Sequence, residues 1–197
     1  MKKKTESTKK EENFGWGDYA VMVDMQWDFI NKALGSPEAE AILPRVERFL
    51  KHFMGRVTYT LDTHDQDYMK KLEGKKLPFP HCIRNTAGWC LPDSLVTLME
   101  NKEASMVTKS TFGTMRLEIN PGSNSKIYIF GLCTNICVVS NALILRAQYP
   151  DHEIICVEDC CAAAGKDSEE RKSNHEAALT VMRSCQIDVV ELEDLFK

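Results

Sequence analysis

Six short apolar segments, rich in β-branched residues, are spaced along the chain and predict β-strands. The fourth contains Ile127-Tyr128-Ile129-Phe130, which is apolar on both faces, as expected for a central strand of a parallel sheet. The other five are bounded by polar or turn-forming residues. The six segments are Tyr19–Asp24, Val57–Leu61, Ser105–Lys109, Lys126–Gly131, Glu153–Glu158 and Ile187–Val190.

Stretches with helical periodicity lie between these segments. A second helix is predicted over Asn135–Tyr149, because Pro150 stops it, and a third over Asp167–Cys185, where Asp167 and Glu170 match a capping box. In the first helix, Pro44 indicates either the first turn or a kink. The apolar face of that first helix is formed by Ile42, Val46, Phe49, Leu50 and Phe53.

Strands that alternate with helices predict an α/β fold: a doubly wound, mostly parallel sheet of about six strands with helices on both faces. The length of 197 residues favours one domain, and 43% hydrophobic with 27% charged residues is typical of globular proteins. The first 13 residues are dominated by lysine, glutamate and threonine and offer little to bury. We therefore expect a flexible tail over residues 1–17 and a single domain over residues 18–197.

The net charge of −4 disfavours a nucleic-acid partner, and no apolar run reaches the roughly 18–20 residues that a membrane span needs. The eight cysteines are irregularly spaced, and no apolar stretch follows the basic start as it would in a signal peptide. These features predict a cytoplasmic protein with reduced thiols. We expect a homo-oligomer that binds a small molecule, without nucleic-acid or membrane partners.

Reactive residues follow the predicted strands, where ligands bind in open α/β sheets. Asp24, Asp62 and Lys109 end the first three strands, the fourth leads into a turn with Cys137, and the fifth ends in Glu158-Asp159. The segment between Asp62 and Leu91 breaks the alternation of elements. Because long loops of this kind are often functional, we expect it to carry part of the site.

Cys137 is a candidate nucleophile. If Thr134 caps the helix, Cys137 falls in its first turn, where the helix terminus and Lys109 would lower its pKa. Asp24 would accept the thiol proton, and amides of the turn would face an oxyanion. The alternative is that Cys137 is an ordinary apolar helix residue. Cys133 is expected to contribute its backbone amide.

A second cluster predicts a metal site. Asp62 and His64 project to one side of an extended chain, and His81 lies in a segment stiffened by two prolines. One carboxylate and two imidazoles suit zinc, iron or manganese, with Glu73 or water completing the shell. The alternative is a polar loop with incidental histidines. No ligand role is assigned to His52, His152 or His175, and Cys160 with Cys161 is expected to pack in the interior.

Four stretches, in this order, resemble the isochorismatase-like cysteine hydrolases, and most closely their nicotinamidase branch. The resemblance runs from residue 19 to about 165. The matching stretches are Val21–Phe29; Leu61–His64 with Pro80–Ile83 and Thr86–Gly88; Thr108–Gly113; and Gly131–Val138.

The resemblance implies an Asp-Lys-Cys triad at Asp24, Lys109 and Cys137, and a cis peptide before Cys133. It implies an oxyanion hole made by the amides of Cys133 and Cys137. It also implies one divalent ion, zinc before iron or manganese, which in nicotinamidases engages the pyridine nitrogen. The metal ligands fall on Asp62, His64 and His81, with Glu73 as a possible fourth. The implied reaction is hydrolysis of nicotinamide to nicotinate and ammonia through a thioester, a step of NAD salvage in pyridine nucleotide biosynthesis.

The chain departs from the nicotinamidase pattern at one position. Nicotinamidases commonly carry a tryptophan three residues before the second metal histidine, and here that residue is Pro78. Phe29, Phe79 or Phe112 would have to pack on the ring instead. Two alternatives therefore stay open: another small amide or ureido substrate, and a binding protein on the same fold that has lost turnover.

Overall fold

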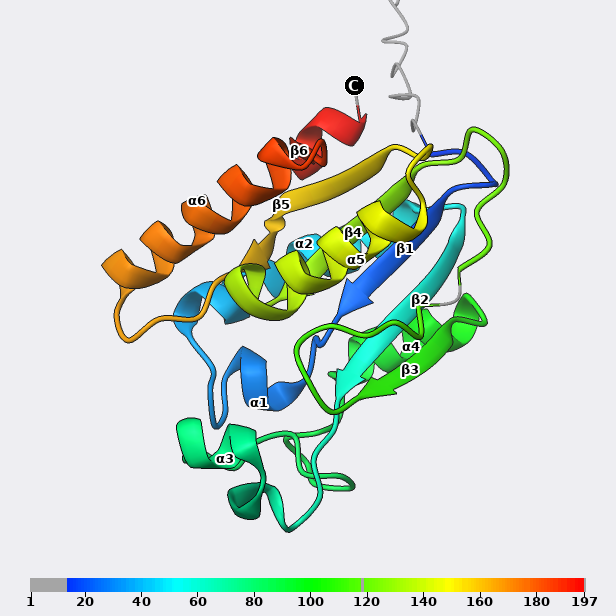
Figure 1. Ribbon diagram of the computed structural model, residues 1–197. Coiled ribbons are helices and arrows are strands. Elements are labelled where there is room, and N and C mark those ends of the chain that lie inside the picture. The colour runs from blue at the N-terminus through cyan, green and yellow to red at the C-terminus, as the bar shows by residue number, and fades with distance from the viewer. Residues whose placement is uncertain (1–13, 118, 197) are drawn as a thin grey trace, which may run out of the picture.

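A computed structural model describes residues 14–117 and 119–196 of the chain (Figure 1). Most of the predicted tail, residues 1–13, lies outside this part. Phe14, which the sequence assigns to the tail, is instead buried, with its ring edge-on to Phe49, Phe53 and Tyr128. Phe14 therefore belongs to the packed domain and not to a flexible tail.

The predicted α/β fold is confirmed, with a six-stranded sheet in which every strand pairing is parallel. The strand order is β3-β2-β1-β4-β5-β6, so β1 and β4 lie at the centre, and both are buried along their whole length. The strands are β1 (Tyr19–Val23), β2 (Arg56–Asp62), β3 (Ser105–Lys109), β4 (Ile127–Leu132), β5 (Ile154–Ala162) and β6 (Asp188–Val190).

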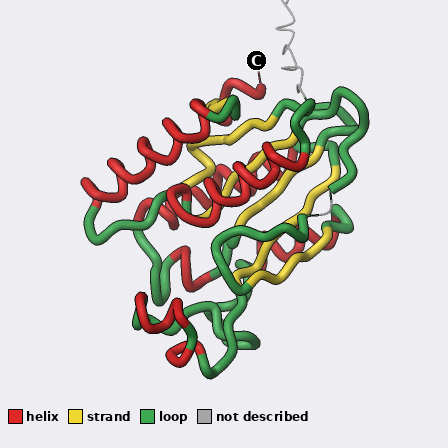
Figure 2. Tube along the Cα trace, in the orientation of Figure 1, coloured by secondary structure: helices red, strands yellow, loops and turns green. Residues whose placement is uncertain are grey.

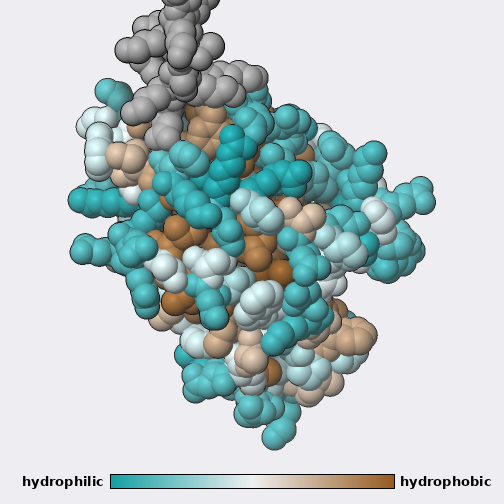
Figure 3. All heavy atoms as spheres, turned by 180° about the vertical axis from the view of Figure 1, so that it is seen from behind, coloured by the Kyte–Doolittle hydropathy of each residue, from teal (hydrophilic) through white to brown (hydrophobic). Residues whose placement is uncertain are grey.

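Helices cover both faces of this sheet, with α5 and α6 on one face and α2 and α4 on the other (Figures 1 and 2). Seen from the α2 side, polar side chains surround hydrophobic residues at the centre of the face (Figure 3). No helix in the described ranges is long and apolar enough to cross a membrane. The α-helices are α1 (Trp27–Ile30), α2 (Pro37–His52), α3 (Leu72–Lys76), α4 (Asp93–Asn101), α5 (Val139–Gln148) and α6 (Ser168–Ser184); shorter helical turns span Tyr68–Lys70, Thr134–Val138 and Leu192–Phe196.

The second and third predicted helices hold at their ends, whereas the first-turn alternative for Pro44 is wrong. The Asp167 side chain accepts a hydrogen bond from the Glu170 amide at the start of α6, as predicted. Pro44, however, lies in the middle of α2, whose first residue is Pro37 and whose N-cap is Ser36. In addition, α1, α3 and α4 are short helices that the apolar pattern did not reveal.

The fifth strand is longer than predicted. Instead of ending at Glu158, β5 continues to Ala162, and its pairing with β4 shifts, so that Ile129 pairs with Cys156 while Gly131 pairs with Cys161. This bulge adds residues on the β5 side, so the strand stays in the sheet beyond the polar residues Glu158 and Asp159. Cys160 and Cys161 therefore lie within the strand, and both are buried, in agreement with a packing role.

An ion pair ties the start of α2 to the start of α6. Arg171 donates to both carboxylate oxygens of Glu38, at 2.7 and 3.1 Å, and Ser168 donates to the same carboxylate at 2.7 Å. These hydrogen bonds, first from Arg171 and then from Ser168, lower the pKa of Glu38 to about 2. Glu38 therefore stabilises the fold in its ionised form.

We expect Glu38→Gln to lower the melting temperature at pH 7, and the difference from the native chain to shrink as the pH falls from about 4.5 towards 2. The reason is that a carboxylate with a depressed pKa stabilises the fold above its usual pKa of 4.5 and loses that contribution on protonation. Thermal unfolding at a series of pH values measures this. Glu169→Gln, in the first turn of α6, is the matched control, and an equal loss in both variants at every pH would contradict the assignment.

Candidate active site

The parallel register brings four predicted site residues to one edge of the sheet. Asp62 at the end of β2 pairs directly with Lys109 at the end of β3. Asp24 follows β1, which lies between β2 and β4. Cys137 lies in the helical turn that follows β4. The carboxyl ends of the strands therefore converge, as the doubly wound fold requires.

Lys109 is the centre of this group. Its ammonium Nζ lies 2.6 Å from Asp24 Oδ2, 3.4 Å from Asp62 Oδ1 and 3.5 Å from Cys137 Sγ. All of these side chains are buried. Burial alone would lower the pKa of Lys109, but Asp24 and Asp62 raise it above its usual value, so the side chain stays charged.

Asp24 is held by a neighbouring strand residue that the sequence analysis did not identify. Thr60 donates a hydrogen bond of 2.7 Å from its hydroxyl to Asp24 Oδ1, and its backbone carbonyl accepts from the Asp24 amide. Burial raises the pKa of Asp24, and the ion pair with Lys109 offsets part of that rise. A buried carboxylate with a raised pKa is suited to accept a proton near neutral pH.

The turn that carries Cys137 differs from the predicted one in its cap. The helix begins at Thr134 with Cys133 as its N-cap, and the Thr134 hydroxyl lies 2.9 Å from Nδ1 of His175 instead of capping. Cys137 still lies in the first, π-helical turn. The peptide between Leu132 and Cys133 is cis, as the family resemblance implies.

The expected lowering of the Cys137 pKa is wrong for this structure. Burial raises the pKa of the thiol well above its usual value, Asp24 raises it further, and Lys109 offsets only part. Because the side chain is almost fully enclosed, the charged thiolate loses more hydration than the nearby ammonium restores. The thiol therefore keeps its proton at rest and needs a base in order to act as a nucleophile.

Asn141, one helical turn after Cys137, holds the turn that carries Cys137 in place by hydrogen bonds. Its side-chain amide donates to the Cys137 carbonyl at 2.7 Å and to the Phe112 carbonyl at 3.2 Å, and its Oδ1 accepts from the Thr114 amide at 3.0 Å. Asn141 is fully buried. It therefore fixes the loop around Phe112 against the turn that carries the thiol.

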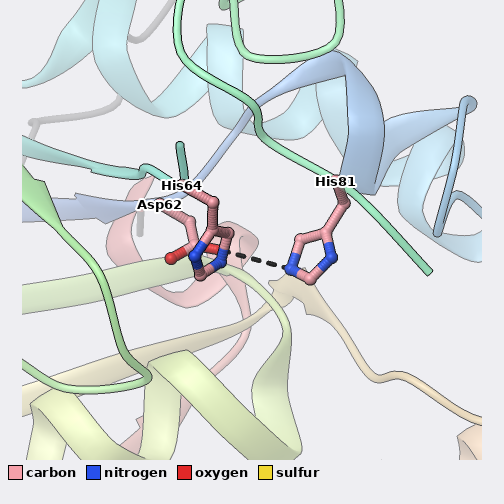
Figure 4. A group of neighbouring side chains, drawn as sticks. All are labelled: Asp62, His64 and His81. Carbon is pink, nitrogen blue, oxygen red and sulfur yellow. Dashed lines mark hydrogen bonds and ion pairs between the residues drawn. The ribbon is translucent and has the colours of Figure 1, made fainter. Parts of the chain in front are cut away.

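Asp62, His64 and His81 form a buried group whose ligand atoms all lie within 4.8 Å of one another. Both imidazole Nε2 atoms approach the same carboxylate oxygen, Asp62 Oδ2, at 3.0 Å for His64 and 3.3 Å for His81 (Figure 4). Glu73 Oε1 lies 3.7 Å from each of these nitrogens. Two imidazoles and one carboxylate that converge on one point match the donor set of a three-ligand zinc site, with Glu73 or water beside it.

Backbone contacts bring the two histidines together. His64 donates from its amide to the Cys82 carbonyl and accepts from the Arg84 amide, which aligns the chain after β2 with residues 81–84. His81 Nδ1 lies 2.8 Å from the Phe79 carbonyl, an acceptor, so Nδ1 carries the proton. In neutral His81 the lone pair is therefore on Nε2, the atom that faces Asp62.

Two polar residues at the start of α1, the N-cap Gln26 and Asp28 in the first turn, support the metal group. The Gln26 side chain accepts from the Asp62 amide at 2.8 Å and donates to the Asp62 carbonyl at 2.9 Å. Asp28 accepts from the Cys82 amide at 2.7 Å. A Cβ at Gly88 would lie 2.1 Å from the Asp28 carboxylate, so the close approach there requires glycine.

A cavity of about 540 Å³ connects the two groups. Its lining includes Asp62, Glu73 and His81 from the metal group, and Cys133 and Cys137 from the chain after β4. All three phenylalanines proposed as ring partners line the same cavity: Phe29 is buried, whereas Phe79 and Phe112 are 57% and 46% exposed. Their placement is compatible with an aromatic ligand between the thiol and the metal group.

The structure therefore brings together every site residue that the sequence predicts, while their chemical roles stay predictions. The residues that sequence reasoning missed are the supporting ones. Thr60 lies two positions before Asp62 on the same strand, and Asn141 lies one helical turn after Cys137, so strand and helix spacing would have placed both beside the site. No comparable spacing relates Gln26 to Asp62, because their contact joins segments that are distant in the chain.

Comparisons with known proteins agree with this architecture. The family model described as the isochorismatase domain matches residues 19–194. A pyrazinamidase of Pyrococcus horikoshii, solved in complex with zinc, is 24% identical and superimposes with a TM-score of 0.66 over 89% of this chain and 99% of its own. A nicotinamidase/pyrazinamidase of Bacillus subtilis is 23% identical, with a TM-score of 0.67 over 88% of this chain and 99% of its own. A nicotinamidase/pyrazinamidase of Acinetobacter baumanii is 18% identical, with a TM-score of 0.72 over 92% of this chain and 99% of its own. The search of curated proteins finds no match.

We expect Gln26→Met to weaken zinc binding by roughly 10- to 100-fold, as is typical when a residue that orients a metal ligand is removed. Methionine keeps the volume of the side chain but leaves the amide and carbonyl of Asp62 without partners. Competition with a chromophoric chelator measures the affinity. Gln66→Met, at an exposed glutamine in the loop after β2, is the control, and equal affinity in the two variants would show that Gln26 does not position Asp62 for the ion.

Proposed function

The chain belongs to the isochorismatase-like hydrolase family, and from that premise we propose that it is an amidohydrolase that converts nicotinamide and water to nicotinate and ammonia. The observation that carries the proposal is the position of Lys109. Its ammonium lies 2.6 Å from the Asp24 carboxylate and 3.5 Å from the sulfur of Cys137, which lines the same cavity as Asp62 and His81 of the metal group.

In the first half of the reaction, Cys137 Sγ attacks the amide carbonyl carbon while its proton passes to the Asp24 carboxylate. The negative charge that develops on the carbonyl oxygen is stabilised by the amides of Cys133 and Cys137. The carbon–nitrogen bond then breaks, and the proton held by Asp24 goes to the leaving nitrogen, which departs as ammonia. The product of this half is a thioester on Cys137.

In the second half, Asp24 takes a proton from water as the water oxygen attacks the thioester carbonyl carbon. The carbon–sulfur bond breaks, and the proton returns to the sulfur, which restores the Cys137 thiol and releases the carboxylic acid. Lys109 keeps its proton throughout. Its charge stabilises the Asp24 carboxylate before the transfer and the sulfur anion during it, because both lie within reach of the same ammonium.

The donor set of Asp62, His64 and His81, with Glu73 beside it, fits a divalent ion, and we propose zinc. When bound, the ion would act as a Lewis acid that holds the pyridine nitrogen of the substrate. The zinc complex of the Pyrococcus horikoshii relative supports this choice of metal. Of the three phenylalanines that line the cavity, Phe29 is the buried one, and its ring centre lies 5.4 Å from that of His81, so among these three it is best placed to contact a ring held there.

A second candidate keeps the chemistry and changes the amide. The observation in its favour is Pro78, which stands where nicotinamidases commonly carry a ring-packing tryptophan, next to the largely exposed Phe79. Ammonia release from a panel of small amides and ureido compounds, with nicotinamide as reference, tests the two candidates against each other. Faster turnover of a panel member than of nicotinamide would favour the second.

We expect Cys137→Ala to lower kcat/KM on the best amide by at least ~10⁴-fold, because loss of a covalent nucleophile removes the acylation path. Cys160→Ala is the matched control: Cys160 is another buried cysteine, and this variant should keep most of the native activity. An ammonia assay measures both. Retention of substantial activity in Cys137→Ala would refute the thioester mechanism.

We expect the purified protein to carry about one divalent ion per chain, and His64→Ala or His81→Ala to lose it, since two remaining ligands hold zinc weakly. Elemental analysis beside the ammonia assay tests this, with His152→Ala as control. Hydrolysis of nicotinamide should follow metal content, and benzamide, which lacks the ring nitrogen, should be a poor substrate. Full activity on nicotinamide without metal, or equal activity on benzamide, would refute the role of the ion in holding the ring.

A further inference from the structure

The cavity above Cys137 is much larger than the proposed substrate. Nicotinamide has about the volume of four water molecules, or roughly 120 Å³ at ~30 Å³ for each water. The cavity measures about 540 Å³. An amide held between the thiol and the metal group therefore leaves most of the space empty.

Part of the cavity wall comes from two connections that sequence reasoning did not assign to the site: the turn between α1 and α2 and the chain between β5 and α6. We call the space beside these two connections the extension. The side chains there are small. Ala39 from the first turn of α2 and Ala163 with Ala164 from the end of β5 line the cavity, and Leu34 adds an apolar surface at its edge.

The polar groups at this end of the cavity are already paired with protein atoms, except at the rim. Arg171 is bound to Glu38 and to the Gly165 carbonyl, and the Ser36 hydroxyl accepts from the Ala39 amide. Lys166 is exposed at the rim. The interior of the extension therefore offers apolar contacts and no free charge among the described residues.

We propose that the amides this site accepts are aromatic primary amides that carry an apolar chain, with the ring near the thiol and the chain in the extension bounded by Ala39 and Ala163. This inference rests on the proposed function for its chemistry. The affinity of the cavity for such a chain does not depend on turnover and is measured separately.

The test uses nicotinamides with a straight alkyl chain of one to four carbons at the 5-position, which adjoins neither the amide-bearing carbon nor the ring nitrogen. We expect kcat/KM of the native holoenzyme to rise about three- to fourfold per methylene until the extension is filled. Ala39→Leu and Ala163→Leu should each remove this rise, because leucine occupies the space of the chain. Ala41→Leu, on an exposed position of α2 outside this cavity, should keep it.

Binding of the same compounds to metal-loaded Cys137→Ala, measured by calorimetry, separates this inference from the proposed function. Affinity that rises with chain length, with an increasingly negative heat-capacity change, supports the extension even if the native enzyme hydrolyses none of the amides, an outcome that would refute the hydrolase proposal. Hydrolysis of nicotinamide with a flat or falling series in both assays would overturn the inference and leave the hydrolase proposal intact.

Discussion

The buried ammonium of Lys109 is the constraint on which the rest of the site depends. A lysine side chain removed from water is stable only if opposite charges surround it, and here two carboxylates, Asp24 and Asp62, do so from different strands. Breaking such a buried pair typically costs about 3–5 kcal/mol, because the remaining charge stays without a partner. The direct pairing of Asp62 with Lys109 in the β2–β3 register makes this arrangement part of the sheet itself.

The burial that holds the charges also determines how the thiol behaves. An exposed cysteine at a helix terminus would ionise more easily, but the enclosed Cys137 keeps its proton, and its reactivity then depends on a base. Asp24 has a raised pKa for the same reason, burial. The site therefore pairs a protonated thiol, the proposed nucleophile, with a carboxylate suited to take its proton, and the Lys109 ammonium lies within reach of both groups.

The parallel sheet, the reactive residues at the ends of its strands and the two side-chain groups could be predicted from the sequence, because each depends on local patterns. Continuous apolar runs such as Ile127–Phe130 indicate central strands, and parallel strands place Asp24, Asp62 and Lys109 at one edge. The predictions that failed depend on distant contacts or on solvation. The extension of β5 beyond Glu158 arises from a bulge against β4, and the sign of the Cys137 pKa shift depends on the depth of burial.

The same distinction separates the supporting residues that local spacing could have predicted from those that it could not. Thr60 and Asn141 lie at strand and helix spacings from recognised residues, whereas Gln26 reaches Asp62 only after the chain has folded. The size of the cavity is likewise a property of packing. Alanine at positions 39 and 163 is unremarkable in the sequence and becomes informative only when both residues line the same space as Cys137.

One carboxylate belongs to both halves of the site: Asp62 faces the two histidines with Oδ2 and Lys109 with Oδ1. The metal group and the group formed by Asp24, Lys109 and Cys137 therefore cannot be changed independently of each other. A descendant of this chain that exchanged Asp62 for a neutral residue to dispense with the ion would also remove half of the negative charge around Lys109. A change of the proposed metal ligand Asp62 therefore also requires a new charge balance next to the thiol, so the two groups are expected to be inherited together.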